Sequence, residues 1–281
     1  SLFGELEPAP KAIEAAPQGP GASQGAYRVL ARKYRPKSFE ELIGQDLMVR
    51  ILTNAFELGR VHQAYMLTGV RGVGKTTTAR ILARALNYHL PARDGRPEID
   101  RPTVHMPELG SHCQAIIDSR HVDVIEMDAA SHTGVDDVRE IIEGARYKPA
   151  VARTKVYIID EVHMLSNSAF NALLKTIEEP PPHVVFMFAT TEIHKVPATI
   201  RSRCQQFNFR LIGLDTIRGL LRGLCDETGI SAQDEALLWI AKEATGSLRD
   251  AYTLFDQVVS FSGGDITMEG IRDKLGLVGL D

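Results

Sequence analysis

The stretch Gly69-Val70-Arg71-Gly72-Val73-Gly74-Lys75-Thr76 decides the fold of this 281-residue chain. It matches the pattern G-x-x-x-x-G-K-[ST] and directly follows the short apolar run 64–67. In such a turn, glycines let the backbone curl so that successive N–H groups face a phosphate, and the following helix adds its positive N-terminus. The stretch therefore predicts a phosphate-binding loop between a buried strand and a helix.

The residues of this loop predict how a nucleoside triphosphate would bind. Lys75 would reach the terminal phosphates, and the Thr76 hydroxyl would bind Mg²⁺. The alternative is a glycine-rich turn that carries a lysine by chance, which the order of strand, loop and helix argues against. The residues that we expect to contact ATP here are Gly69, Val70, Arg71, Gly72, Val73, Gly74, Lys75, Thr76 and Thr77.

A second motif delivers two carboxylates, Asp160 and Glu161, at the end of the apolar run 156–159. Parallel α/β sheets bind their ligands at this end of their strands. We expect Asp160 to hold Mg²⁺, directly or through water, and Glu161 to orient and polarise the attacking water. The alternative is that the two acids only mark a strand end that faces solvent. The phosphate-binding loop upstream argues against this alternative.

Apolar runs alternate with helical patterns along the first two thirds of the chain. Further buried strands are predicted at 122–126 and 184–189, and helices with one apolar face at 135–145 and at 170–177, before three prolines. Alternation of this kind predicts an α/β sheet covered by helices on both faces.

The chain divides into three parts by composition. Residues 1–25 are rich in Ala, Pro, Gly and Gln and predict a disordered tail or a cloning remnant, and residues 26–211 carry the α/β pattern. Residues 212–281 predict a small helical domain, with Ser231 as a helix cap and helix ends at Gly229, Gly246 and Gly263-Gly264. The abrupt end near Leu280 leads us to expect further domains in a longer protein.

Composition restricts the class of protein. Hydrophobic residues make up 44% and charged residues 24% of the chain, as in a globular protein, and no run is long enough to span a membrane. We therefore expect a cytoplasmic protein with its three cysteines reduced. The net charge of −4 means that any contact with DNA must be local.

Three further positions carry weaker signals. Thr190 and Thr191 end an apolar strand, where a hydroxyl can bond the attacking water or the γ-phosphate, although β-branched residues also close strands by propensity. Arg203 lacks an acidic neighbour in sequence, and a solvated surface cation is its default interpretation. Arg249 opens a helix of the small domain, where it can reach across a cleft to the nucleotide or pair locally with Asp250.

Taken together, the motifs resemble those of the bacterial DNA polymerase III gamma/tau clamp-loader subunits, which are AAA+ ATPases. The Ser-Arg-Cys triplet is especially typical of clamp loaders, and the resemblance runs from Tyr27 to the end of the chain. It implies an AAA+ P-loop core with a five-stranded parallel sheet, followed by a small all-helical lid. The segments that carry it are 32–36, 69–76, 160–163, 170–175, 178–181, 190–191, 202–204 and 246–250.

The resemblance also implies roles for individual residues. Thr191 would be the first nucleotide sensor, Arg249 the second, and Arg203 an arginine finger that acts on ATP bound by a neighbouring subunit. The family's adenine pocket would correspond here to Ala31, Arg35, Pro36 and Val49. The implied partners are other clamp-loader subunits in a hetero-oligomeric ring, the sliding clamp and primed DNA, with polymerase and helicase for the full-length protein.

One departure from the family concerns zinc. Members usually carry four zinc-binding cysteines after the phosphate-loop helix, and the corresponding positions here are Tyr88, Pro107, Gly110 and Cys113. One thiolate does not make a tetrahedral zinc site, and His105 and His112 are irregularly spaced from it, so we do not expect zinc. A surface loop is predicted in place of the metal knuckle.

Three other functions fit parts of the sequence. The Asp-Glu-Val-His run at 160–163 also fits a helicase, but helicases of that class have two motor domains and this chain has one phosphate loop. Another AAA+ replication or recombination ATPase, such as a branch-migration motor, fits the core but not the Ser-Arg-Cys triplet. A nucleotide-gated scaffold that does not hydrolyse ATP is the remaining alternative, and the complete set of Lys75, Thr76, Asp160 and Glu161 favours hydrolysis over it.

Overall fold

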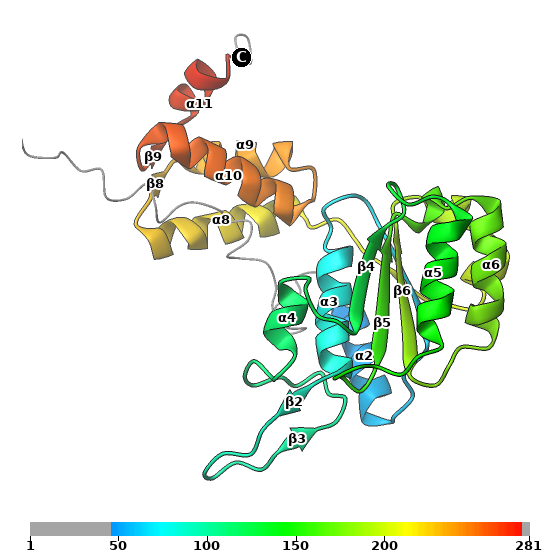
Figure 1. The fold of residues 1–281 in the computed structure, drawn as a ribbon. Coiled ribbons are helices and arrows are strands. Elements are labelled where there is room, and N and C mark those ends of the chain that lie inside the picture. Colours follow the sequence, from blue (N-terminus) through cyan, green and yellow to red (C-terminus); the bar gives the residue numbers. More distant parts are fainter. Residues whose placement is uncertain (1–45, 277–281) are drawn as a thin grey trace, which may run out of the picture.

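A five-stranded parallel sheet forms the centre of the computed structural model, which describes residues 46–276 (Figure 1). Its strand order is β4-β5-β6-β1-β7, and every adjacent pair is parallel. The predicted α/β fold with a five-stranded parallel sheet is therefore confirmed. The strands are β1 Ala64–Thr68, β4 Val124–Asp128, β5 Lys155–Asp160, β6 Val184–Thr190 and β7 Gln205–Asn208.

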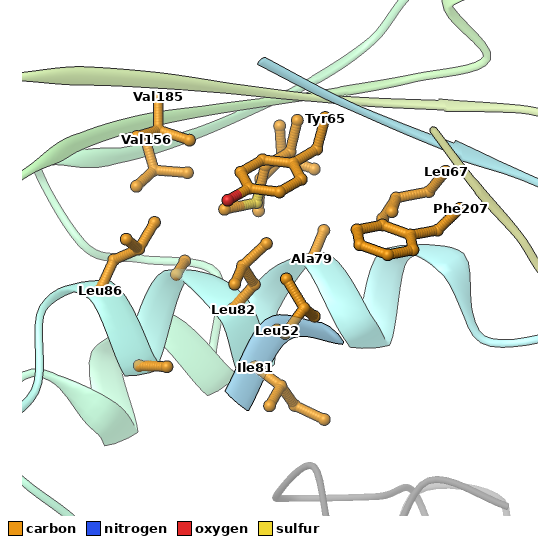
Figure 2. Close-up of a cluster of buried hydrophobic side chains, with 14 of the residues drawn as sticks. Leu52, Tyr65, Leu67, Ala79, Ile81, Leu82, Leu86, Val156, Val185 and Phe207 are labelled. Atoms are coloured by element: carbon orange, nitrogen blue, oxygen red, sulfur yellow. The ribbon is translucent and has the colours of Figure 1, made fainter. Parts of the chain in front are cut away.

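Helices cover both faces of this sheet. On one face lie α2 (Asp46–Glu57) and the loop helix α3 (Lys75–Leu86), and on the other lie α5 (Val135–Ala145) and α6 (Asn167–Glu178) (Figure 1). Alternate side chains of β1 pack into the cores on the two faces of the sheet, because successive residues of a strand point to opposite sides. Tyr65 and Leu67 pack toward α3 (Figure 2), whereas Ala64 and Met66 belong to the core under α5 and α6.

The carboxyl ends of the strands meet at one edge, which positions the candidate site. Thr68, the last residue of β1, is in register with Thr190 at the end of β6, and Asp128 of β4 is in register with Asp160 of β5. The phosphate-binding loop leaves β1 at this edge and leads into α3. Residues far apart in sequence, such as Thr76 and Asp160, which are 84 positions apart, are thereby brought together.

Residues 88–113 are partly ordered into strands, although the sequence predicts a surface loop at 90–107. They contain a short antiparallel pair, β2 (His89–Leu90) and β3 (Ile99–Asp100), in an arm that projects beyond the sheet (Figure 1). Buried Tyr88, Leu90 and Cys113 form an apolar cluster at its base, so these side chains pack as hydrophobes. Between residues 46 and 276, no group of three or more His, Cys, Asp or Glu side chains is placed to hold a metal ion.

After β7 the chain forms a mainly helical unit with its own core. Its helices are α8 (Leu214–Thr228), α9 (Asp234–Glu243), α10 (Leu248–Ser262) and α11 (Met268–Leu275), packed around residues such as Leu221, Leu237 and Phe255. The lid is not entirely helical, because β8 (Ser231–Ala232) and β9 (Asp265–Ile266) form a two-residue parallel pair. None of the helices within the described range is long and apolar enough to cross a membrane.

The helix boundaries of this unit correct some expectations and confirm others. Ser231 is not a helix cap, because it lies in β8 and α9 begins after Gln233 instead. Gly229 and Gly263 end α8 and α10 in the left-handed conformation, as predicted. Gly246 does not end α9, because that helix ends at Glu243 and Ala244 is its cap residue. The proposed division of the chain at residues 211 and 212 stays a prediction.

The predicted strand at 122–126 begins two residues later than expected, because Asp123 serves as a cap for a neighbouring turn. Its buried carboxylate accepts hydrogen bonds from the backbone N–H groups of Ala150, Val151 and Ala152 at 2.6 to 2.8 Å. Burial alone would raise the pKa of Asp123, but these three hydrogen bonds outweigh it and hold the pKa below its ordinary value.

Replacing Asp123 by Asn is therefore expected to lower the free energy of unfolding at neutral pH by about 2 kcal/mol, since an amide cannot accept all three bonds. Because the folded-state pKa is depressed, this contribution is present above the unfolded pKa of about 4 and is lost as the pH falls through the folded value. Urea denaturation at pH 7 and at progressively lower pH measures the difference. The exposed Asp136→Asn variant is the control, and equal stability of the two variants at pH 7 would contradict the capping role.

Candidate nucleotide-binding site

The predicted phosphate-binding loop has the expected backbone. Helix α3 begins at Lys75, as predicted, and Gly74 precedes it with φ of 104°. Gly72 has φ of 79°, and a Cβ added there would lie 2.6 Å from Ser247 Oγ. Both positions require glycine, the first for its backbone conformation and the second for conformation and space.

The Lys75 side chain is held against the loop that it follows. It is 6% exposed, and its Nζ donates hydrogen bonds to the carbonyl oxygens of Gly69 (2.7 Å) and Val70 (2.8 Å). Burial lowers the pKa of Lys75, and the nearby carboxylates of Glu161 and Asp160 partly offset this. The Lys75 cation and the two acids at the end of β5 therefore lie within electrostatic reach of one another.

Thr76 and Asp160 come together as the sequence predicts. Thr76 Oγ1 lies 3.4 Å from Asp160 Oδ2, while Asp160 Oδ1 accepts a hydrogen bond from the backbone N–H of Glu161. A hydroxyl and a carboxylate are hard oxygen donors, the kind that Mg²⁺ prefers. The two side chains thus offer a donor set that fits this cation.

Glu161 stands on a strained backbone at the tip of β5. Its φ of 50° and ψ of 44° place it in the left-handed region, which non-glycine residues seldom occupy. Strain of this kind tends to persist where the position of a side chain matters for function. The Glu161 carboxylate is partly exposed, and its Oε2 accepts a hydrogen bond from Thr191 Oγ1 at 3.1 Å.

One residue to which the sequence assigned no role, His163, completes this group. His163 follows Glu161 in the 3₁₀ helix η2 (Val162–Met164), and its Nδ1 lies 2.8 Å from Thr190 Oγ1. Thr190 is fully buried, so its hydroxyl faces the protein, whereas Thr191 contacts Glu161. The run 160–163 was the available signal for His163, but sequence could not reveal its partners.

The helical unit contacts the phosphate-binding loop directly. Ser247, the residue before α10, donates a hydrogen bond from its hydroxyl to the carbonyl oxygen of Gly72 at 3.1 Å and accepts one from the backbone N–H of Asp250. The spacing of Ser247 and Asp250 is the sequence signal of a helix cap. Arg249 is exposed in the first turn of the same helix, next to this contact.

Arg203 is paired, contrary to the expectation from its sequence neighbours. It follows α7 (Ala198–Arg201), and its guanidinium lies 3.4 Å from Glu178 Oε1 at the end of α6. Half of the Arg203 side chain is exposed, and a surface pair of this kind contributes little to stability. The arginine is therefore available to exchange this partner for another anion.

The expected adenine-pocket residues are only partly described. Val49 lies in α2, where it is partly buried against the core that covers one face of the sheet. Ala31, Arg35 and Pro36 lie outside the described residues.

Comparison with known proteins gives consistent family matches for both parts of the chain. Residues 44–212 match the family described as "DNA polymerase III, delta subunit", and residues 216–264 match "DNA polymerase III clamp loader subunit, ATPase lid domain". The chain is 44% identical to the DNA polymerase III subunit tau of Escherichia coli (strain K12) over 89% of its own length and 38% of the relative's. It is 43% identical to the gamma subunit of Buchnera aphidicola subsp. Schizaphis graminum, with coverage of 89% and 66%.

Solved structures support the fold. The Thermotoga maritima RuvB Holliday junction branch migration motor superposes with a TM-score of 0.61 at 20% identity, covering 88% of this chain and 74% of that one. At this identity the likeness concerns architecture alone. The chain spans about two fifths of the length of the Escherichia coli relative.

Proposed function

Because the chain belongs to the family of DNA polymerase III gamma and tau subunits, whose members are clamp-loader ATPases, we propose that it is the ATP-hydrolysing motor of a sliding-clamp loader. The observation that carries this proposal is the meeting of Lys75, Thr76, Asp160 and Glu161 at one edge of the sheet. These four side chains combine phosphate binding, metal binding and water activation in one place.

Binding of the triphosphate rests on the loop and on the start of α3. The backbone N–H groups of the loop after Gly69 and the N-terminus of α3 would face the phosphates, and the Lys75 ammonium would neutralise their charge. Thr76 and Asp160 would hold Mg²⁺, which would neutralise charge that develops on the phosphate oxygens. Ala31, Arg35, Pro36 and Val49 contact the adenine in this proposal, as the family resemblance implies.

Hydrolysis rests on Glu161. Its carboxylate orients the attacking water and polarises its O–H bond, which requires a carboxylate held at a fixed position near the γ-phosphate. The hydrogen bond from Thr191 supports such a position. In this proposal the same hydroxyl also responds to the γ-phosphate as a sensor, as the family resemblance implies. A scaffold that only binds nucleotide has no need of the strained backbone at Glu161, so the geometry favours hydrolysis.

Coupling of the nucleotide to the lid rests on α10. Ser247 links the lid to the Gly72 carbonyl, so a change in the loop alters a contact of the first turn of this helix. Arg249, in that turn, reaches the phosphates when the lid closes. ATP binding thereby selects one arrangement of the lid relative to the sheet.

Coupling to other subunits rests on Arg203. We infer that it leaves Glu178 and stabilises transition-state charge on ATP in the adjacent subunit of a hetero-oligomeric ring. The ring, in the cytoplasm, would hold an opened sliding clamp, and primed DNA would trigger hydrolysis and release of the clamp. In a longer protein, further domains would contact polymerase and helicase.

ATP hydrolysis measured with and without partner subunits, clamp and primed DNA tests this function. The proposal predicts a low rate for the isolated chain and strong stimulation by the complete set, because the arginine finger comes from a neighbour. Stimulation by branched DNA without any clamp would instead favour a branch-migration motor. Absence of stimulation by the complete set would overturn the loader assignment.

A further inference from the structure

His163 has a buried side chain that lies close to Thr190, Glu192 and the carboxylate of Glu161. Its side chain is only 4% exposed, and its ring lies between Thr190 on one side and two carboxylates on the other. Nδ1 is 2.8 Å from Thr190 Oγ1, and Nε2 is 3.5 Å from Glu161 Oε2 and 3.3 Å from Glu192 Oε2.

These contacts determine which ring nitrogen carries a proton. Nε2 faces two carboxylate oxygens, and an unprotonated nitrogen there would place three acceptors together. We therefore assign the proton of the neutral imidazole to Nε2. In the neutral form Nδ1 accepts a hydrogen bond from the Thr190 hydroxyl, whose oxygen accepts the backbone N–H of Glu192 at 3.0 Å.

Both groups near Glu161 lie closest to the same carboxylate oxygen. Thr191 Oγ1 donates to Oε2 at 3.1 Å, and His163 Nε2 lies 3.5 Å from Oε2. Within residues 46–276, neither of these donors engages Oε1. One oxygen is thus used for anchoring, and the other is left to bind the attacking water.

We propose that His163 is a positioning residue that fixes the Glu161 carboxylate for water activation, together with Thr191. This inference rests on the proposed function, because it assigns a role within the same hydrolytic site. Consecutive residues at the end of β6 then have separate tasks: Thr190 orients the imidazole, Thr191 binds the carboxylate, and Glu192 holds the imidazole from outside.

Glu192 supports the arrangement because it is itself anchored. A hydrogen bond from Lys195 holds the pKa of Glu192 below its ordinary value, and the nearby His163 acts in the same direction. The imidazole therefore lies between one anchored carboxylate and the carboxylate of Glu161. A γ-phosphate sensor is expected at the end of β6. A shift there would move Glu161 both through Thr191 and through Thr190 and His163.

Two substitutions at position 163 separate packing from hydrogen bonding. His163→Phe fills the buried space without an N–H group, whereas His163→Gln restores a donor near the position of Nε2. In the full-length protein assembled with its partner subunits, clamp and primed DNA, we expect the phenylalanine variant to lower the single-turnover rate of ATP cleavage about tenfold. The glutamine variant should recover most of that loss, and the Mg·ATP dissociation constant should change less than about threefold in both.

The combination with Glu161→Gln distinguishes positioning from a general structural effect. If His163 acts through Glu161, adding His163→Phe to Glu161→Gln causes no further loss of rate, whereas independent effects would multiply. Thr190→Val, which removes the hydroxyl at Nδ1, should lower the rate in the same direction and provides the test if His163→Phe does not fold. Multiplicative losses, or unchanged rates in both His163→Phe and Thr190→Val, would overturn the proposal. Full turnover in Glu161→Gln alone would instead refute the proposed role of Glu161.

Discussion

Replacing Glu161 by Gln is expected to lower the rate of ATP hydrolysis by about 10² to 10⁴-fold while Mg·ATP still binds. The amide keeps the size of the side chain but does not take up a proton from the attacking water. Lys75, Thr76 and Asp160 remain in place, so the phosphate and metal contacts persist. Phosphate release in single-turnover experiments gives the rate, and fluorescent nucleotide titration gives the affinity.

Glu243→Gln is the matched control for this change. Glu243 is an exposed residue at the end of α9, and its substitution alters the charge of the protein by the same amount. We expect its rate to equal that of the unsubstituted protein. If Glu161→Gln hydrolyses ATP as fast as this control does, the water-activating role belongs to another residue.

Replacing Arg203 by Ala is expected to lower ATP hydrolysis of the assembled loader by about 10³-fold or more, because an arginine finger stabilises transition-state charge on a neighbour's nucleotide. The isolated chain should retain its own low rate. Its thermal stability should change little, since the surface pair of Arg203 with Glu178 is half-exposed on both sides. The measurement compares hydrolysis by the isolated and assembled proteins.

Comparison of the isolated chain with the assembled loader tests whether Arg203 acts between subunits. Arg218 provides the control, because it is also partly exposed and also pairs with a carboxylate, that of Asp215. Arg218→Ala is expected to leave both rates unchanged. A loss in the isolated Arg203→Ala chain as large as that in the assembly would place the action of Arg203 within its own subunit.

Much of the sheet follows from apolar runs in the sequence. The strands β1, β5 and β6 begin and end within one residue of the predicted runs, because buried parallel strands are apolar on both faces. The fifth strand, β7, was expected only from the family resemblance. Its sequence Gln-Gln-Phe-Asn has a single apolar residue, as an edge strand with little buried surface allows.

The phosphate-binding loop and both carboxylates were also accessible to sequence analysis, because each motif is local. The partners of His163, Ser247 and Arg203 were not, since Thr190, Gly72 and Glu178 lie 25 to 175 positions away. Pairing across such separations depends on the sheet order. The apolar cluster of Tyr88 and Cys113 was missed for a similar reason. Its residues are far apart in sequence and follow neither a metal-binding motif nor the periodicity of a helix or a strand.

The central claim is that the loop around Lys75 and the acids at the tip of β5 bind a magnesium triphosphate. The affinity of the purified chain for Mg·ATP, measured by calorimetry beside that of Lys75→Ala, tests it most directly. We predict clear binding by the unsubstituted chain and loss of most of it in Lys75→Ala, at equal melting temperature without nucleotide. Equal affinity of the two proteins, or no binding by either, would contradict the account.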